Sequence, residues 1–190
     1  MYFRNTALTV ALGLTMALPV LAGDEHAKGY REHGAHVHGA GDLNVAVDGN
    51  ALLVELHGPA ANLVGFEHPP RNATEEQVVA EVRAKLVDPA LTFLPNAEAE
   101  CTLTDSEVFM ELAGDDSGHD HDHDHDQTGE VHSDAGVAYS FDCAAPDQLS
   151  SLALALFETF PGTQRLRVQL ITADAQRAVE LTAGDAALAL

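Results

Sequence analysis

The sequence is short of positive charge. Its 190 residues include nine lysines and arginines against thirty aspartates and glutamates, which gives a formal net charge of −21. The nine cationic residues are scattered along the chain and form no basic patch. An acidic surface repels nucleic acids and anionic lipids and attracts cations. The composition therefore excludes nucleic-acid binding and favours a cationic ligand.

Long hydrophobic runs are also rare, and the clearest one lies near the start of the chain. Residues 1–22 contain Arg4, an apolar stretch from Ala7 to Leu18 and the small residue Ala22, which is the pattern of a secretory signal peptide. The apolar stretch is shorter than a typical membrane span, and an uncleaved N-terminal anchor is the alternative. Because no second hydrophobic span follows, we expect an exported chain that does not insert into the membrane. In a bacterium its compartment would be the periplasm.

Cysteine is scarce, since the chain contains only Cys101 and Cys143. An even number of cysteines in an exported chain favours a disulfide. Closing a loop of this length stabilises a protein by about 4 kcal/mol in the chain-entropy description. The alternative is that both cysteines bind zinc, but export favours oxidation and the sequence has no C-x-x-C spacing.

Histidine, by contrast, is abundant and unevenly distributed. Residues 119–126 alternate histidine with aspartate, and the four histidines are His119, His121, His123 and His125. The tract has no apolar side chain, so we expect the insert that contains it, residues 113–130, to be disordered without a ligand. Imidazole and carboxylate groups both bind zinc and related divalent ions. The tract therefore predicts metal capture, with a solvated acidic loop as the alternative.

Other candidate ligands occur within the part of the chain that is expected to fold. His36 and His38 are two residues apart, so their rings would project from one face of an extended strand. His132 lies where the insert rejoins the folded chain. Zinc usually takes four ligands. These three histidines would supply three of them, and Glu67, His68, Glu130 or water would supply the fourth, although Glu67 and His68 also fit an ordinary surface loop.

Alternating apolar residues predict the strands of the folded part, residues 35–190, which follows a flexible segment at 23–34. One β-hairpin is expected at 41–57 and a second one at 166–182. Two further strands, within 97–112 and 137–143, would flank the insert and bring the two cysteines together.

Two main helices are expected to pack on these strands. The first would begin at a capping box formed by Thr74 and Gln77 and would end before Pro89. The second would run from Asp147 to Phe160, where apolar residues recur at helical spacing. The predicted fold class is therefore α+β, with antiparallel hairpins and two helices. A faint repetition between the halves of the chain suggests two pseudo-symmetric lobes as a variant of this architecture.

Five short motifs occur in a specific order along nearly the whole chain after residue 22. They are His33-Gly-Ala-His-Val-His-Gly39, Val64-Gly-Phe-Glu-His68, Tyr139-Ser-Phe-Asp-Cys143, Leu156-Phe-Glu-Thr-Phe-Pro161 and Val168-Gln-Leu-Ile171. In these motifs the chain resembles the ZrgA-type family of zinc-regulated periplasmic zinc-binding proteins. The resemblance implies a periplasmic protein with a His-rich insert that binds zinc and serves a zinc importer of the ATP-binding-cassette type.

The resemblance also places candidate residues on family positions without specifying which of them bind zinc. These residues are His36, His38, Glu67, His68, Cys101, Cys143 and the histidines of the insert. His57 stands where a carboxylate is expected in relatives, so we give it little weight.

Two other functions remain as alternatives. A periplasmic metal buffer without a transporter would need the same ligands. A small zinc-dependent hydrolase is disfavoured because the sequence has no H-E-x-x-H motif, and because Gly39-Ala-Gly41-Asp42 lacks the additional short-spaced ligand that follows H-x-H in binuclear hydrolases. We therefore expect no catalytic activity, zinc as the bound ion, and inner-membrane importer components as partners.

Overall fold

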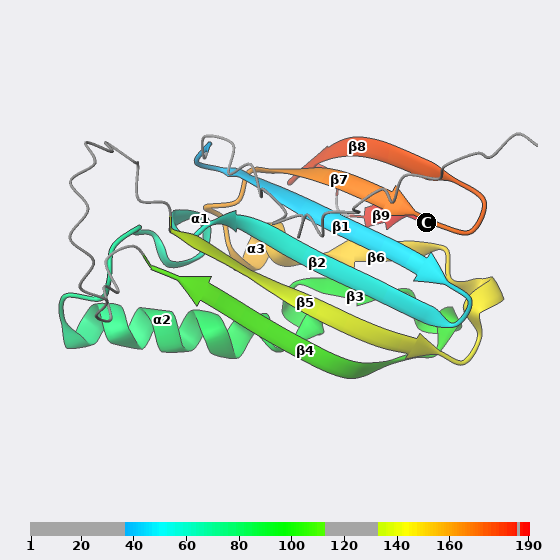
Figure 1. The fold of residues 1–190 in the computed structure, drawn as a ribbon, viewed down its shortest axis with the longest axis horizontal. Coiled ribbons are helices and arrows are strands. Elements are labelled where there is room, and N and C mark those ends of the chain that lie inside the picture. The colour runs from blue at the N-terminus through cyan, green and yellow to red at the C-terminus, as the bar shows by residue number, and fades with distance from the viewer. Residues whose placement is uncertain (1–36, 113–132, 186) are drawn as a thin grey trace, which may run out of the picture. The chain divides into compact units, whose positions relative to one another are not determined.

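The computed structural model describes residues 37–112, 133–185 and 187–190 (Figure 1). Within these residues the strands are β1 (Ala40–Asp48), β2 (Ala51–Pro59), β3 (Phe93–Pro95), β4 (Cys101–Glu111), β5 (Asp134–Cys143), β6 (Ser151–Leu154), β7 (Arg165–Ile171), β8 (Gln176–Thr182) and β9 (Ala187–Ala189). The helices are α1 (Ala61–Val64), α2 (Ala73–Leu86) and α3 (Leu156–Thr159). The fold is mixed α+β, as the sequence predicts.

Several features expected from the sequence lie outside the described residues. They are the signal peptide at 1–22, the segment at 23–34, the insert at 113–130, and the histidines His36, His119, His121, His123, His125 and His132.

Six strands form the larger sheet, in the order β4-β5-β2-β1-β7-β8. Three antiparallel hairpins, β1–β2, β4–β5 and β7–β8, account for most of it, and all three agree with the predicted strand pairs. Gly49 has a φ of 59°, which suits the tight turn between β1 and β2. The hairpins are joined by the antiparallel pair β2–β5 and the parallel pair β1–β7. The parallel pair is not among the strand pairings that the sequence predicts.

The three-stranded sheet, in the order β3-β6-β9, packs behind the larger sheet (Figure 1). Alternate residues of the larger sheet, such as Leu43, Val54 and Val137, are fully buried against it. Val82 and Leu86 of α2 join the same hydrophobic cluster. Because residues from both halves of the chain share this one core, the described residues do not divide into two lobes.

The prediction of a second main helix over residues 147–160 is wrong. Residues 151–154 form strand β6, and the helical parts are a short 3-10 turn at Pro146–Gln148 and the single α-helical turn of α3. Leu152 and Leu154 are buried while Ala153 is exposed, which is strand periodicity. A short apolar run fits either period, and here Phe93 of β3 and Leu188 of β9 pair with Leu154 and Leu152 on either side.

The start of the first predicted helix also needs correction. Asn72, and not Thr74, is the N-cap of α2, and its side-chain oxygen accepts from the backbone N–H groups of Thr74 and Glu75, at 3.1 Å each. Asparagine is among the strongest N-cap residues. The helix ends at Leu86, before Pro89, as expected. In the described parts of the chain no helix is long and apolar enough to cross a membrane.

Cys101 and Cys143 form the predicted disulfide, with an S–S distance of 2.01 Å. They are direct partners in the register of β4 and β5. They lie at the start of β4 and the end of β5, and Glu111 pairs with Asp134 at the other end of the same two strands. Because both sulfur atoms are in the disulfide, the alternative of two cysteine ligands is excluded in this state of the protein.

Candidate metal centre

Two of the candidate ligands, His38 and Glu67, lie at one end of the six-stranded sheet, which we call the insert end. β1 begins there at Ala40, β2 ends at Pro59, β4 ends at Glu111, and β5 begins at Asp134. Residues 1–36 and 113–132 join the described chain at this end, next to Val37, Leu112 and Ser133. Hairpin topology alone produces this arrangement, because antiparallel strands return to the end from which the chain left.

His38 and Glu67 meet at the insert end although they are 29 residues apart in the sequence. The Nε2 atom of His38 lies 3.0 Å from Oε1 of Glu67. The side chains are 69% and 33% exposed, so solvent and ions can reach both of them. Two ligand atoms about 2 Å from one zinc ion at a tetrahedral angle are separated by ~3.3 Å. A zinc ion between these two atoms would therefore need them to separate by only a few tenths of an ångström.

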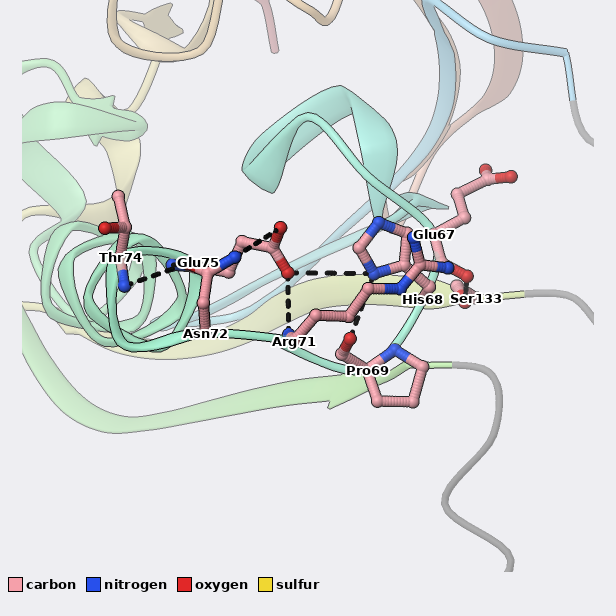
Figure 2. A network of polar contacts seen from close by, with 8 residues as sticks. All are labelled: Glu67, His68, Pro69, Arg71, Asn72, Thr74, Glu75 and Ser133. Carbon is pink, nitrogen blue, oxygen red and sulfur yellow. Dashed lines mark hydrogen bonds and ion pairs between the residues drawn. The ribbon is translucent and has the colours of Figure 1, made fainter.

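Ser133 holds the backbone of Glu67 in place. Its hydroxyl donates to the Glu67 carbonyl at 2.8 Å, and its own carbonyl accepts from the N–H of Ala60 at 2.8 Å. Ser133 is fully buried and directly follows the histidine-bearing segment 113–132 in the sequence. The point at which this segment re-enters the fold is thus fixed beside Glu67 (Figure 2).

His68 turns towards the start of α2 and not towards Glu67. Its Nδ1 lies 2.9 Å from the Pro69 carbonyl and 3.8 Å from Oε2 of Glu75, and its ring stacks on Phe66 with the centroids 5.0 Å apart. In Figure 2 the Glu67 carboxylate points away from the His68 ring. A carbonyl oxygen only accepts hydrogen bonds, so Nδ1 is the donor in this contact, and in the neutral ring Nε2 would keep a lone pair for a metal ion.

Glu75 is the carboxylate that faces His68. The backbone N–H of Arg71 donates to its Oε2 at 2.7 Å, and this bond is the main cause that keeps the pKa of Glu75 below its usual value. The side-chain amide of Asn72 donates to its other oxygen and acts in the same direction. Glu75 therefore adds to the negative charge of the insert end.

His57 is separate from this group. Its Nε2 lies 2.7 Å from Oε1 of Glu55, and its ring centroid lies 4.5 Å from that of Phe109. Among the described residues, no three His, Cys, Asp or Glu side chains are close enough together to hold a metal ion. The structure thus brings His38 to Glu67, pairs His68 with Glu75 instead, and leaves the grouping with His36 and His132 untested.

Residues 35–190 match the family described as ZrgA family zinc uptake protein. The chain belongs to this family. The match includes every described residue and the insert, and it agrees with the resemblance in the sequence motifs. A search among curated proteins finds no match to this chain. Membership of this family supports a zinc-related role for the protein.

Two polar residues of this ZrgA family protein escaped the sequence-based interpretation. Ser133 carries no ligand chemistry, and its function depends on a partner 66 residues away, so no local pattern reveals it. Glu75 appears in the sequence as one of several acidic residues on the polar face of a helix. Its position at the third residue after the N-cap was the available signal, because a glutamate there turns back towards the start of the helix.

Proposed function

We propose that this ZrgA family protein captures Zn²⁺ in the periplasm and supplies it to an inner-membrane zinc importer of the ATP-binding-cassette type. His38 and Glu67 would provide two ligands of the tighter site. His36 and His132, which precede Val37 and Ser133 in the sequence, would provide further ligands, together with His68 or water. The zinc ion is the cargo, and we propose no catalytic step.

The contact between His38 and Glu67 carries this proposal. An exposed ion pair contributes at most about 1 kcal/mol to stability, so folding gives little reason to place these two residues together. Imidazole nitrogen and carboxylate oxygen are both ligands that zinc accepts. Zinc needs about four ligands, and the two chain segments that carry eight of the other ten histidines join the fold at this end.

The histidine tract would act as a second, weaker site. Ordering a flexible segment on binding lowers its affinity, but four alternating imidazoles give a high local ligand concentration. The net charge of −21 raises the concentration of cations around the whole protein. Ions gathered by residues 119–125 could then pass to the site at His38 and Glu67.

Calorimetric titration with Zn²⁺ tests the tighter site. Substituting His38→Ala or Glu67→Ala is expected to weaken it at least 10- to 100-fold, the range that is typical for losing even a supporting hydrogen bond at a metal site. Deleting residues 115–129 should remove the weaker binding and leave the tighter site. Thermal unfolding of the zinc-free variants should be nearly unchanged, because the pair is exposed.

His57→Ala is the matched control, since it removes a histidine that also contacts a glutamate. Its zinc affinity should equal that of the wild type. If deletion of 115–129 abolished all binding while His38→Ala had no effect, the folded site would be rejected.

Growth under zinc chelation tests delivery to an importer. A deletion strain is expected to grow poorly in chelator and to recover when excess zinc is added. Complementation by the His38→Ala variant should be weaker than by His57→Ala at equal protein levels. Normal growth of the deletion strain in chelator would contradict a role in delivery, and it would favour a periplasmic metal buffer.

Cell fractionation tests the proposed location. Recovery of the protein in the cytoplasm would contradict the periplasmic location.

A further inference from the structure

The backbone around His38 is held by a buried side chain that carries no ligand chemistry. Asn62 of α1 is only 6% exposed. Its Oδ1 accepts from the N–H of Gly39 at 2.7 Å, and its Nδ2 donates to the carbonyl of Ala40 at 2.9 Å. Both hydrogen-bonding functions of the amide are therefore used on the two residues that follow His38.

These bonds fix a β-turn with His38 near its tip. The N–H of Ala40 donates to the carbonyl of Val37 at 2.9 Å, and Gly39 has a φ of 80°. A positive φ at the third residue is typical of a type II turn. His38 is the second residue of this turn, so the direction of its side chain depends on how firmly the turn is held.

The same asparagine lies on the chain that leads to Glu67. α1 ends at Val64 and is capped by Gly65, which has a φ of 87° and donates its N–H to the Ala61 carbonyl at 3.0 Å; Glu67 follows two residues after this cap. The backbone of Asn62 also packs closely on Gly162, because a Cβ there would lie only 2.4 Å from the Asn62 backbone carbonyl oxygen.

We propose that Asn62 is a positioning residue for zinc capture. It sets the separation of His38 from Glu67, because it ties the turn that carries His38 to the helix that precedes Glu67. This inference rests on the proposed function only where it concerns zinc affinity. The effect of Asn62 on the contact between His38 and Glu67 can be measured without metal. Supporting groups of this kind typically change metal affinity 10- to 100-fold when they are removed.

The zinc-free protein provides the first test. Nuclear Overhauser contacts between the His38 ring and the Glu67 side chain should be present in the full wild-type chain, with His38 assigned from the His38→Ala spectrum. They should be lost in Asn62→Ala. They should also be lost in Asn62→Asp, which keeps the volume but turns an acceptor towards the Ala40 carbonyl. Persistence of the contact in either folded variant would overturn the inference.

Thr92→Val is the matched control for general destabilisation. Thr92 is also buried and polar, and its hydroxyl lies 2.7 Å from the Tyr139 hydroxyl in the core. This variant should have a lower melting temperature but should retain the His38–Glu67 contact and wild-type zinc affinity. Loss of the contact in Thr92→Val as well would show that any destabilisation suffices, and it would overturn the specific role of Asn62.

A double-mutant cycle provides the second test. Asn62→Ala should weaken zinc binding 10- to 100-fold in the wild-type background and less than twofold in the His38→Ala background, because its effect passes through His38. Equal weakening in both backgrounds would overturn the inference. If His38→Ala alone left zinc affinity unchanged, the proposed function would fail, and the metal-free contact would still decide the role of Asn62.

Discussion

Removing the disulfide by Cys101→Ala with Cys143→Ala is expected to lower the free energy of unfolding by about 4 kcal/mol. The bond joins residues separated by 42 positions. Without it the unfolded chain gains the conformational entropy of a loop of that length. Urea denaturation of the oxidised wild type, the reduced wild type and the double variant would measure the difference. The last two proteins should have similar stability.

The same variant also separates structure from metal binding. The disulfide lies at the end of β4 and β5 that is remote from Glu111 and Asp134, so it is remote from the insert end. Zinc affinity of the folded double variant should therefore match that of the wild type. A stability loss below about 1 kcal/mol would contradict the loop-entropy account, which is itself an upper value when the unfolded state retains structure. A loss of the tighter zinc site would contradict this separation of structure from metal binding.

Local signals were sufficient to predict the hairpins. In β1 and β2, alternating apolar residues such as Leu43 and Val54 face the core before and after the turn at Gly49, and the sequence shows both the alternation and the turn. The disulfide followed from two cysteines placed on strands that flank the insert. These features involve neighbours in sequence or a single pair of special residues, so they need no knowledge of the rest of the fold.

Long-range pairing was not accessible in this way. The parallel pairing of Ala40 with Arg165 joins residues from the two halves of the chain, and nothing in either segment specifies the other. The strand at residues 151–154 is hard to predict for the same reason, because its apolar pattern also suits a helix and only the pairing with β3 and β9 makes it a strand. Tertiary contacts then decide between two local structures of similar intrinsic stability.

The candidate site shows the same difference between what local sequence and long-range contacts determine. His38, Glu67 and His68 were recognised by their ligand chemistry, but the sequence did not indicate that Glu67 faces His38 while His68 faces Glu75. Asn62 and Ser133 were not recognised, because each acts on the backbone of a residue that is distant in sequence. Ligand types can be read from a sequence, whereas the side chains that hold them in place emerge only from the fold.

Gly136→Ala is expected to destabilise the protein by about 3 kcal/mol, at the upper end of typical overpacking costs. Gly136 lies in β5 between His57 of β2 and Phe109 of β4. A Cβ atom here would lie 1.9 Å from the carbonyl oxygen of Leu56 and 2.4 Å from Cζ of Phe109. The phenyl ring can rotate aside, but the carbonyl belongs to the backbone of β2, so β2 and β5 must separate.

The measurement is urea denaturation, with Gly184→Ala as the control, since the nearest atom to a Cβ there is 3.8 Å away. Because alanine also restricts the unfolded chain, the control should be unchanged or stabilised by up to about 1 kcal/mol. The proton resonances of His57 should shift in Gly136→Ala, because the Phe109 ring, whose centroid lies 4.5 Å from that of the imidazole in the wild type, would have to move. Equal stability of the two variants would mean that β2 and β5 are not packed as closely at Gly136 as the structure places them. It would also contradict the described geometry of the insert end, where Ser133 leads into β5.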